Sequence, residues 1–179
     1  AETEELADEL GLEIALPPRA LREHIDSKIT TTELANEAGI ASAPNVLARA
    51  ASYDELLRRA RKAKLGSDLV VQTPYGDSGR TTFFISSEEH WDAVAGKLVD
   101  EELKIMRRLE HLPGTVEACA TRHGTLVGPI QTDITGFEEL TPYRGGWCGN
   151  DIFPGVFDAA TRKAIRTMAR RLGDTLYAN

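Results

Sequence analysis

Hydrophobic residues recur every three or four positions in four stretches of the chain, which is the spacing of one face of an α-helix. This pattern predicts helices over residues 21–38, 53–65, 88–98 and 159–172. The first helix is expected to break near Asp26, and Asp158 is expected to cap the last. Capping boxes match at residues 30–33, 52–55 and 86–89. The last helix is predicted to turn these residues inward: Ala164, Ile165, Met168 and Leu172.

The predicted strands are short and several follow one another closely, so mostly antiparallel pairing is expected in a mixed α and β layout. Apolar or alternating runs predict strands over residues 12–16, 40–47, 68–72, 80–85, 103–109, 116–121 and 125–130. Two hairpins are expected, one with a long glycine-containing tip and one turned at residues 122–124. Residues 135–154, which are rich in glycine and aromatic residues, predict a structured loop that either binds a ligand or is purely structural.

The composition is that of a globular domain, with 41% hydrophobic and 27% charged residues. A net charge of −7 makes nucleic acid an improbable partner. No apolar run approaches the roughly 18 residues that a spanning helix needs, so no membrane partner is expected. The two cysteines are too few for a disulfide framework, and we expect a cytoplasmic protein with reduced thiols. The four histidines lack ligand spacing, so no metal site is expected within the chain.

The segment from Gln72 to Arg80 has the most distinctive local chemistry. Gly76 and Gly79 allow backbone conformations in which successive N–H groups converge on an anion. Ser78 adds a hydroxyl and Arg80 adds positive charge. A flexible tip of this kind suits a lid over phosphates, and the alternative is a solvent-exposed turn.

A second candidate is Lys28, which stands near a predicted helix start. A lysine at this position can reach a bound phosphate as a point charge. The alternative is an ordinary surface lysine.

Three stretches are informative through their order and spacing, although each one alone is degenerate. The first runs from Asp26 through Lys28 to Ile40, the second is the predicted hairpin over residues 69–82, and the third joins residues 104–110 to 116–118. Together they resemble the ATP-grasp superfamily, in particular its biotin-carboxylase-like ligases, and the resemblance extends over residues 15–179.

The resemblance implies an α+β fold in which an ATP-grasp-type antiparallel sheet with flanking helices is incomplete. It implies a lead-in segment at residues 1–25 from a missing N-terminal domain, and the lid subdomain at residues 26–98. Residues 99–179 would then be the truncated beginning of the second ATP-grasp subdomain.

The resemblance also implies which residues hold the nucleotide. Lys28 matches the first phosphate-binding lysine of the family, and the glycine-rich tip matches its lid over the β- and γ-phosphates. Residues 106–109 match the hinge beside adenine, Glu110 matches a ribose partner, and Glu117 matches a polar position on the following strand. The expected nucleotide-binding residues are Lys28, Gln72, Gly76, Ser78, Gly79, Arg80, Met106, Arg107, Arg108, Leu109, Glu110 and Glu117.

Two positions depart from the family pattern. Gln72 stands where the family has a second lysine, so it offers a hydrogen bond without charge, and Arg80 is expected to compensate. Met106 stands where the family has a hinge acid, so the adenine contact would have to come from the backbone. The magnesium ligands of the family lie on later strands and are expected downstream of this chain, in which no catalytic residue is identified.

The function implied by the resemblance is ATP-dependent ligation through an acyl-phosphate, with ATP and Mg²⁺ as cofactors. The partners would be a small-molecule carboxylate and a nucleophile, and a homodimer is compatible with the resemblance. The chain alone is expected to be inactive. The alternative is a non-catalytic nucleotide-sensing or assembly module that retains the fold, for which Gln72 is the best support.

Overall fold

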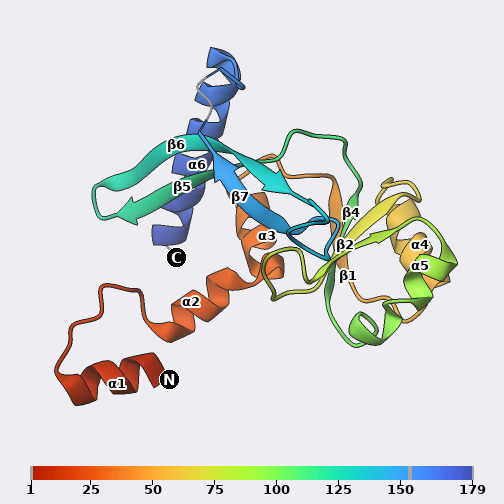
Figure 1. Ribbon diagram of the computed structural model, residues 1–179, viewed down its shortest axis with the longest axis horizontal. Coiled ribbons are helices and arrows are strands. Elements are labelled where there is room, and N and C mark those ends of the chain that lie inside the picture. The colour runs from red at the N-terminus through yellow and green to blue at the C-terminus, as the bar shows by residue number, and fades with distance from the viewer. Residues whose placement is uncertain (1, 153–154, 179) are drawn as a thin grey trace.

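The computed structural model describes residues 2–152 and 155–178. Within this range the chain forms two antiparallel sheets with flanking helices (Figure 1). Phe153 and Pro154, at the end of the predicted aromatic loop, lie outside the described residues, as do Ala1 and Asn179.

The first sheet has the strand order β1-β4-β2-β3. Its strands are β1 (Asn45–Ala48), β4 (Leu103–Arg107), β2 (Leu69–Gln72) and β3 (Thr82–Ile85). All three pairings are antiparallel, and β2 and β3 form the hairpin that the sequence predicts. β1 begins directly after Pro44 at the edge of the sheet, where the missing N–H of proline is tolerated.

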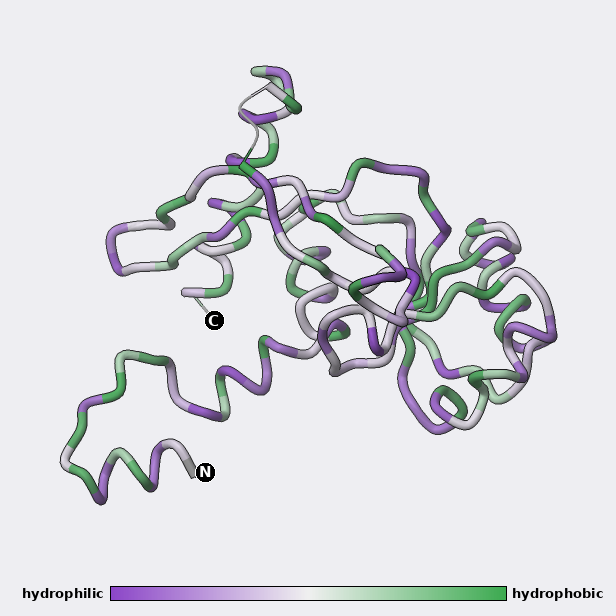
Figure 2. The backbone as a smooth tube through the Cα atoms, in the orientation of Figure 1, coloured by the Kyte–Doolittle hydropathy of each residue, from purple (hydrophilic) through white to green (hydrophobic). Residues whose placement is uncertain are grey.

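One face of the first sheet holds the hydrophobic core. Alternate residues of the strands point to this face, where α4 (Tyr53–Lys62) and α5 (Glu88–Asp92) cover them. The hydrophobic segments converge in this part of the molecule in Figure 2. Leu56 from α4, Ile105 from β4 and Trp91 from α5 are among its buried residues. Each fully buried aliphatic side chain contributes about 1.5–3 kcal/mol, so these contacts anchor the first sheet.

The second sheet consists of β5 (Gly114–Thr121), β6 (Gly124–Thr135) and β7 (Trp147–Asp151). The helix α6 (Ala159–Ala178) packs on β5 and β6. Gly173 is the buried residue of α6 among those described, and its missing Cβ leaves room for Thr125 of β6. The hydroxyl of Thr125 donates to Asp174 at 2.6 Å, which ties helix and sheet together.

The structure corrects two predictions in this part of the chain. The segment 135–154 is not only a loop, because residues 147–151 pair with β6 as β7. Ala164 and Met168 of α6 are exposed and do not point inward. The face of α6 that contains Gly173 packs against Thr125 instead.

The N-terminal residues form two helices instead of the predicted strand over residues 12–16. These are α1 (Glu2–Leu10) and α2 (Arg19–Asp26), which extend away from the two sheets (Figure 1). Residues 12–16 are irregular and have no strand partner among the described residues, and Leu12 and Leu16 are more than half exposed. An apolar run without a neighbouring strand gains no ladder hydrogen bonds, so the prediction is wrong here.

The predicted helix over residues 21–38 is broken at Ser27, as expected. Its second part is α3 (Lys28–Glu37), and Gly39 follows with a φ of +62°. The side chain of Ser27 accepts from the N–H of Thr30 at 3.3 Å, so Ser27 is the N-cap. The capping box predicted at residues 30–33 is therefore wrong, because these residues lie inside the helix.

The sheets do not divide at the predicted subdomain boundary. β4 begins after residue 98, yet it pairs with β1 and β2 in the first sheet. The short η1 (Ala95–Lys97) turns the chain from α5 toward β4. The second sheet begins at Gly114, after the irregular residues 108–113.

Candidate functional site

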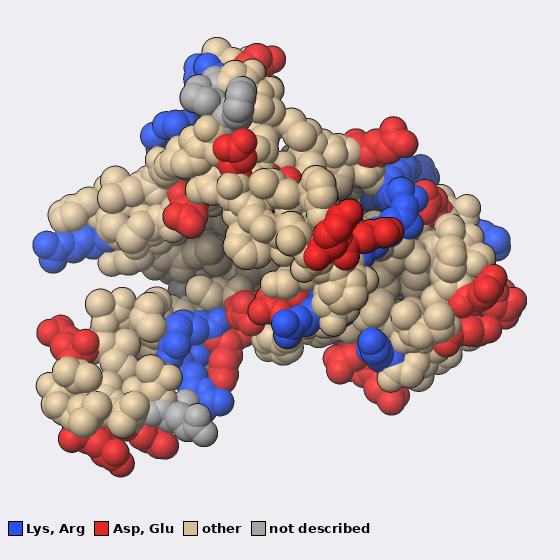
Figure 3. All heavy atoms as spheres, viewed as in Figure 1, with Lys and Arg blue, Asp and Glu red and all other residues tan. Residues whose placement is uncertain are grey.

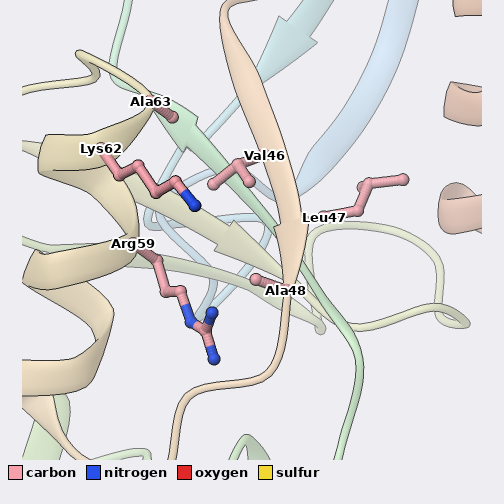
Figure 4. Close-up of a pocket in the computed structure, with 6 residues that line it drawn as sticks. All are labelled: Val46, Leu47, Ala48, Arg59, Lys62 and Ala63. Carbon is pink, nitrogen blue, oxygen red and sulfur yellow. The ribbon is translucent and has the colours of Figure 1, made fainter.

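The face of the first sheet opposite the core, which we call the open face, brings the candidate residues together. Strand alternation puts Val46 and Ala48 against α4, whereas Leu47 points to the other side of β1 (Figure 4). Leu47 pairs with Lys104, Lys104 with Gln72, and Gln72 with Thr82. Directly opposed residues of antiparallel strands share a face, so these four form one row across the open face.

The next row on the open face is more apolar. Met106 pairs with Val70, and Val70 pairs with Phe84. The polar row containing Lys104 and Gln72 lies nearer to the loop between β2 and β3, and the apolar row lies farther from it. The open face therefore offers an apolar surface beside a polar one, as a ligand with a flat ring and a charged tail would need.

Residues 73–81, which we call the lid tip, connect β2 to β3. Tyr75, Ser78 and Arg80 are exposed, so the tip is not buried against the body of the molecule. The backbone is left-handed at Ser78, with φ of +51°, and at Gly79, with φ of +78°. The N–H of Arg80 donates to Asp77 within the tip, at 3.0 Å.

Gly79 is the point where the lid tip meets the loop that leads into β7. A Cβ at this position would lie 2.7 Å from the carbonyl carbon and oxygen of Gly145. Gly145 belongs to the loop that leads into β7, so a residue with a side chain at position 79 would push this loop and the lid tip apart.

Lys28, the first residue of α3, lies beneath the lid tip. Its backbone N–H donates to the carbonyl of Pro74 at 2.8 Å, and its ammonium donates to the carbonyl of Gly76. Partial burial lowers the pKa of Lys28, against the opposing effect of Asp26 and Asp77. The structure therefore joins two segments that the sequence singled out separately, the lysine and the glycine-rich tip.

Gln72 and Arg80 lie at opposite ends of the tip region. The amide nitrogen of Gln72 donates to the hydroxyl of Thr82 at 3.0 Å, so its side chain leans toward β3. Arg80 is exposed, and its nearest carboxylate is Asp77 at 3.9 Å. A surface pair of this length contributes little to stability, so the guanidinium of Arg80 is available to a ligand.

Lys104 is a candidate that the sequence analysis missed. Lys104 is half-buried in the polar row. Two causes lower the pKa of its ammonium: burial, which is the larger, and the positive charge of Lys28. Among the described residues, no carboxylate or hydrogen-bond acceptor pairs with its ammonium. A signal was present in the sequence, because Lys104 interrupts an apolar strand between the buried residues Leu103 and Ile105. Only the strand register shows that it lies beside Gln72.

In the predicted hinge, residues 106–109, the two arginines are held by hydrogen bonds within the protein. The N–H groups of Arg107 and Arg108 donate to the carbonyls of Pro44 and Asp68, at 3.1 and 3.0 Å, so both are engaged within the first sheet region. The guanidinium of Arg107 donates to the carbonyls of residues 64 and 65, which gives it a structural role.

Beyond these arginines, Leu109 and Glu110 are exposed. The carbonyl of Leu109 lies 2.9 Å from the ring Nδ1 of His111. Glu117 is exposed on β5 and lines a shallow hollow together with Cys119 and Leu126 of the second sheet.

Two arginines converge on Phe84 of the open face. The guanidinium of Arg108 lies 5.8 Å from the ring centre, and that of Arg144 lies 4.7 Å from it. Arg144 comes from the glycine-rich and aromatic loop, so part of that loop packs on the open face. Farther along it, the indole N–H of Trp147 donates to Asn150 at 2.9 Å, and the amide of Asn150 donates to Asp133 at 2.6 Å.

A separate hollow lies between α4 and the edge strand β1. It has a volume of about 310 Å³ and is lined by Val46, Leu47, Ala48, Arg59, Lys62 and Ala63 (Figure 4). Arg59 and Lys62 extend toward β1 over an apolar floor, but neither contributes to the lid tip. The open face is the better candidate for a binding site, because it collects the polar groups that could recognise a ligand.

Over residues 2–152 and 155–178, no three His, Cys, Asp or Glu side chains gather as a metal site requires. No described helix has the length and apolar character needed to cross a membrane. Acidic and basic side chains are interspersed on the face shown in Figure 3, without one large basic surface.

Comparison with known proteins gives no match by sequence but a clear one by structure. No protein-family model matches the chain, and no curated protein matches it by sequence. A carboxyaminoimidazole ribonucleotide synthase from Aspergillus clavatus, complexed with ATP, superposes with a TM-score of 0.67 at 20% identity, covering 97% of this chain and 43% of that one.

Two other ligases superpose similarly. D-alanyl-alanine synthetase A from Vibrio cholerae has a TM-score of 0.65 at 12% identity, and the match covers 85% of this chain and 47% of that one. Phosphoribosylamine–glycine ligase from Thermotoga maritima has a TM-score of 0.63 at 16% identity, covering 90% of this chain and 41% of that one.

The chain spans less than half the length of each of these ligases. At such low identity the likeness shows the fold alone. The fold is part of the ATP-grasp fold, as the resemblance in the sequence implied.

Proposed function

From the ATP-grasp fold as a premise, we propose that this chain binds ATP between its lid tip and the open face of the first sheet, as the ATP-binding part of an ATP-dependent ligase. The observation that carries this proposal is the contact of the Lys28 ammonium with the carbonyl of Gly76. It puts a positive charge directly under an exposed, glycine-containing tip. The ATP complex of the Aspergillus synthase, which has the same fold, supports ATP as the ligand.

The two rows of the open face suggest how the nucleotide would lie. Adenine is flat and apolar on its faces, so it suits the part of the apolar row formed by Val70 and Met106, beside the guanidinium groups that cover Phe84. The phosphates would then extend along the polar row toward Lys28 and the lid tip. Backbone N–H groups near Gly79 and the guanidinium of Arg80 would complete the phosphate contacts.

We further propose that the whole protein activates a small-molecule carboxylate. In this chemistry a carboxylate oxygen attacks the γ-phosphorus of ATP, the bond to the β-phosphate oxygen breaks, and ADP leaves. A nucleophile such as an amine then adds to the acyl-phosphate carbonyl and expels phosphate. The described residues would contribute by positioning ATP and neutralising its charge.

The part of the chain that is described does not offer a set of ligands for Mg²⁺. No step of the proposed mechanism is therefore assigned to a metal held by these residues. The contributions proposed for this chain come from its ammonium groups, its guanidinium and its backbone amides.

Calorimetry and thermal unfolding of the whole protein with ATP, with and without Mg²⁺, test this proposal. A ligand present at 100 times its Kd adds about 2.7 kcal/mol to the free energy of unfolding. We expect a higher Tm with ATP and a smaller rise with AMP, because AMP lacks the phosphates that the lid tip would cover. The absence of any ATP effect would reject the proposal.

A second candidate function is a nucleotide-sensing or assembly module without catalysis. Gln72 favours it, since an uncharged side chain stands where the resemblance expects a lysine. The two functions differ in turnover, not in binding. A module that only senses nucleotide binds ATP but releases no phosphate when a panel of carboxylates and amines is supplied, whereas a ligase does so with its own substrates.

A further inference from the structure

Two ammonium groups approach the open face from neighbouring elements. Lys28 enters from α3, which contacts β4, and Lys104 stands on β4 itself. The contact between α3 and β4 brings the two lysines into one region, and the positive charge of Lys28 is the lesser of two causes that lower the pKa of Lys104. Like charges repel each other, and Asp26 and Asp77 offset this repulsion at Lys28 alone, so an anion with more than one negative charge would stabilise the pair further.

The surroundings of Lys104 favour a role in binding an anion over a purely structural one. Its ammonium has no carboxylate or acceptor partner among the described residues, whereas nearby Arg107 and Arg108 are both engaged. A lysine whose aliphatic part only covers apolar surface would extend its charge into water, away from a second lysine. Lys104 instead remains half-buried in the row that leads to the lid tip.

The register connects Lys104 with Gln72. The two residues are directly opposed on β4 and β2, so their Cβ atoms lie about 4.5–5.5 Å apart and on the same face. The side chain of Gln72 is turned the other way, toward Thr82 of β3. A charge carried by Lys104 can therefore occupy the space above position 72.

We propose that Lys104 is a phosphate-binding residue that, together with Lys28, clamps the β- and γ-phosphates of a nucleoside triphosphate, and that it supplies from the neighbouring strand the positive charge that Gln72 lacks. This inference rests on the proposed function, because it assigns one more residue to the same ATP site. It explains why a chain with glutamine at position 72 can still bind a triphosphate.

The test compares Kd values for ATP and AMP, measured by calorimetry on the whole protein. In Lys104→Gln the Kd for ATP should rise about 10- to 100-fold, as loss of a charged hydrogen-bond partner implies, while AMP binding changes little. The matched control is Lys163→Gln, which removes an exposed lysine of α6 and should leave both Kd values unchanged. Lys104→Arg should retain ATP binding, because it keeps the charge.

The decisive variant moves the lysine from β4 to the opposed position on β2. Gln72→Lys combined with Lys104→Gln should restore ATP binding to within about threefold of the wild type, since both positions share one face. Melting curves of every variant confirm that it is folded, and Lys104→Met replaces Lys104→Gln if the latter does not fold.

The outcomes separate this inference from the proposed function. ATP binding that is equally tight in the wild type and in Lys104→Gln overturns the role of Lys104 and leaves the proposed function standing. Failure of the wild type to bind ATP overturns the proposed function, and the role of Lys104 with it. If Lys104→Gln weakens ATP binding and the double variant does not restore it, then Lys104 does not take the place of a lysine at position 72.

Discussion

At the scale of single residues, the ammonium of Lys28 has one stabilising and one destabilising interaction. Its ammonium donates to the carbonyl of Gly76, which stabilises the lid tip. Its charge also stands at the first position of α3, where the positive end of the helix dipole disfavours a cation. These two effects oppose each other in the protein without ligand, whereas a bound phosphate would favour the charge unambiguously.

Lys28→Ala should therefore weaken ATP binding and leave the fold intact. We expect the Kd for ATP to rise about 10- to 100-fold, as loss of a charged hydrogen bond implies. The free energy of unfolding should change by less than about 1 kcal/mol, because the lost hydrogen bond and the relieved dipole repulsion offset each other. Calorimetry and denaturant unfolding measure the two quantities, and unchanged ATP affinity would contradict the assignment of Lys28.

At the scale of elements, the break between α2 and α3 positions Lys28. Ser27 is buried, adopts an extended backbone and accepts a hydrogen bond from the N–H of Thr30. It is therefore the N-cap of α3, and Lys28 is the first residue of the helix. Because the cap determines where the helix begins, it also determines which residue lies under Pro74 and Gly76.

Ser27→Ala should lower the free energy of unfolding by about 1 kcal/mol, the usual effect of losing an N-cap. Thr30→Ala is the matched control, because Thr30 lies inside α3 and alanine is a better helix former. Urea unfolding of both variants compares them directly. A larger loss for Thr30→Ala would mean that the capping box predicted at residues 30–33 is the real helix start.

The lid tip and the loop before β7 form another element-scale contact, at Gly79. Gly79 and Gly66 have similar left-handed backbones, with φ of +78° and +84°. A Cβ at Gly79 would meet the backbone of Gly145 at 2.7 Å, whereas a Cβ at Gly66 would meet nothing within 4 Å. The two positions therefore separate backbone strain from steric contact.

Gly66→Ala should cost about 1–2 kcal/mol through backbone strain alone. Gly79→Ala should cost more, and it should also weaken ATP binding, because the tip must move away from Gly145. Unfolding and nucleotide titration of both variants measure these effects. Equal losses of stability with unchanged ATP affinity in Gly79→Ala would identify the tip as a merely structural turn.

At the scale of the whole molecule, the two sheets are stabilised unequally. The buried hydrophobic cluster lies on the first sheet and includes Leu69, Val71 and Leu103. In the second sheet the large apolar residues Leu126, Ile134 and Trp147 are exposed. Because hydrophobic burial is the main favourable term in folding, the second sheet should open at a lower free energy than the first.

Hydrogen exchange of the isolated chain tests this difference. We expect the amides of β2 and β4 to be the most protected, and those of β5 to β7 to exchange faster by a factor of ten or more, since about 1.4 kcal/mol of opening free energy corresponds to tenfold. Addition of ATP should slow exchange in the lid tip. Equal protection in both sheets would show that the second sheet has stabilising contacts beyond those described.

The sequence by itself determined much of the local structure. Serine caps, glycine helix ends and apolar alternation predicted α4, the hairpin of β2 and β3, and the edge position of β1, because these features depend on residues close together in the chain. It also identified Lys28 and the glycine-containing tip as candidates for phosphate binding, and the ATP-grasp resemblance is confirmed at the level of fold. The roles of the individual site residues stay predictions.

Only the tertiary structure decided which of these residues meet. Residues 12–16 have a strand-like pattern but no partner strand, and the exposed face of α6 follows from the fit of Gly173 against Thr125. The position of Lys104 beside Gln72 depends on pairing between β4 and β2, which are thirty residues apart in the chain. Such long-range pairing is set by burial and register across the whole sheet, and no local pattern of residues contains that information.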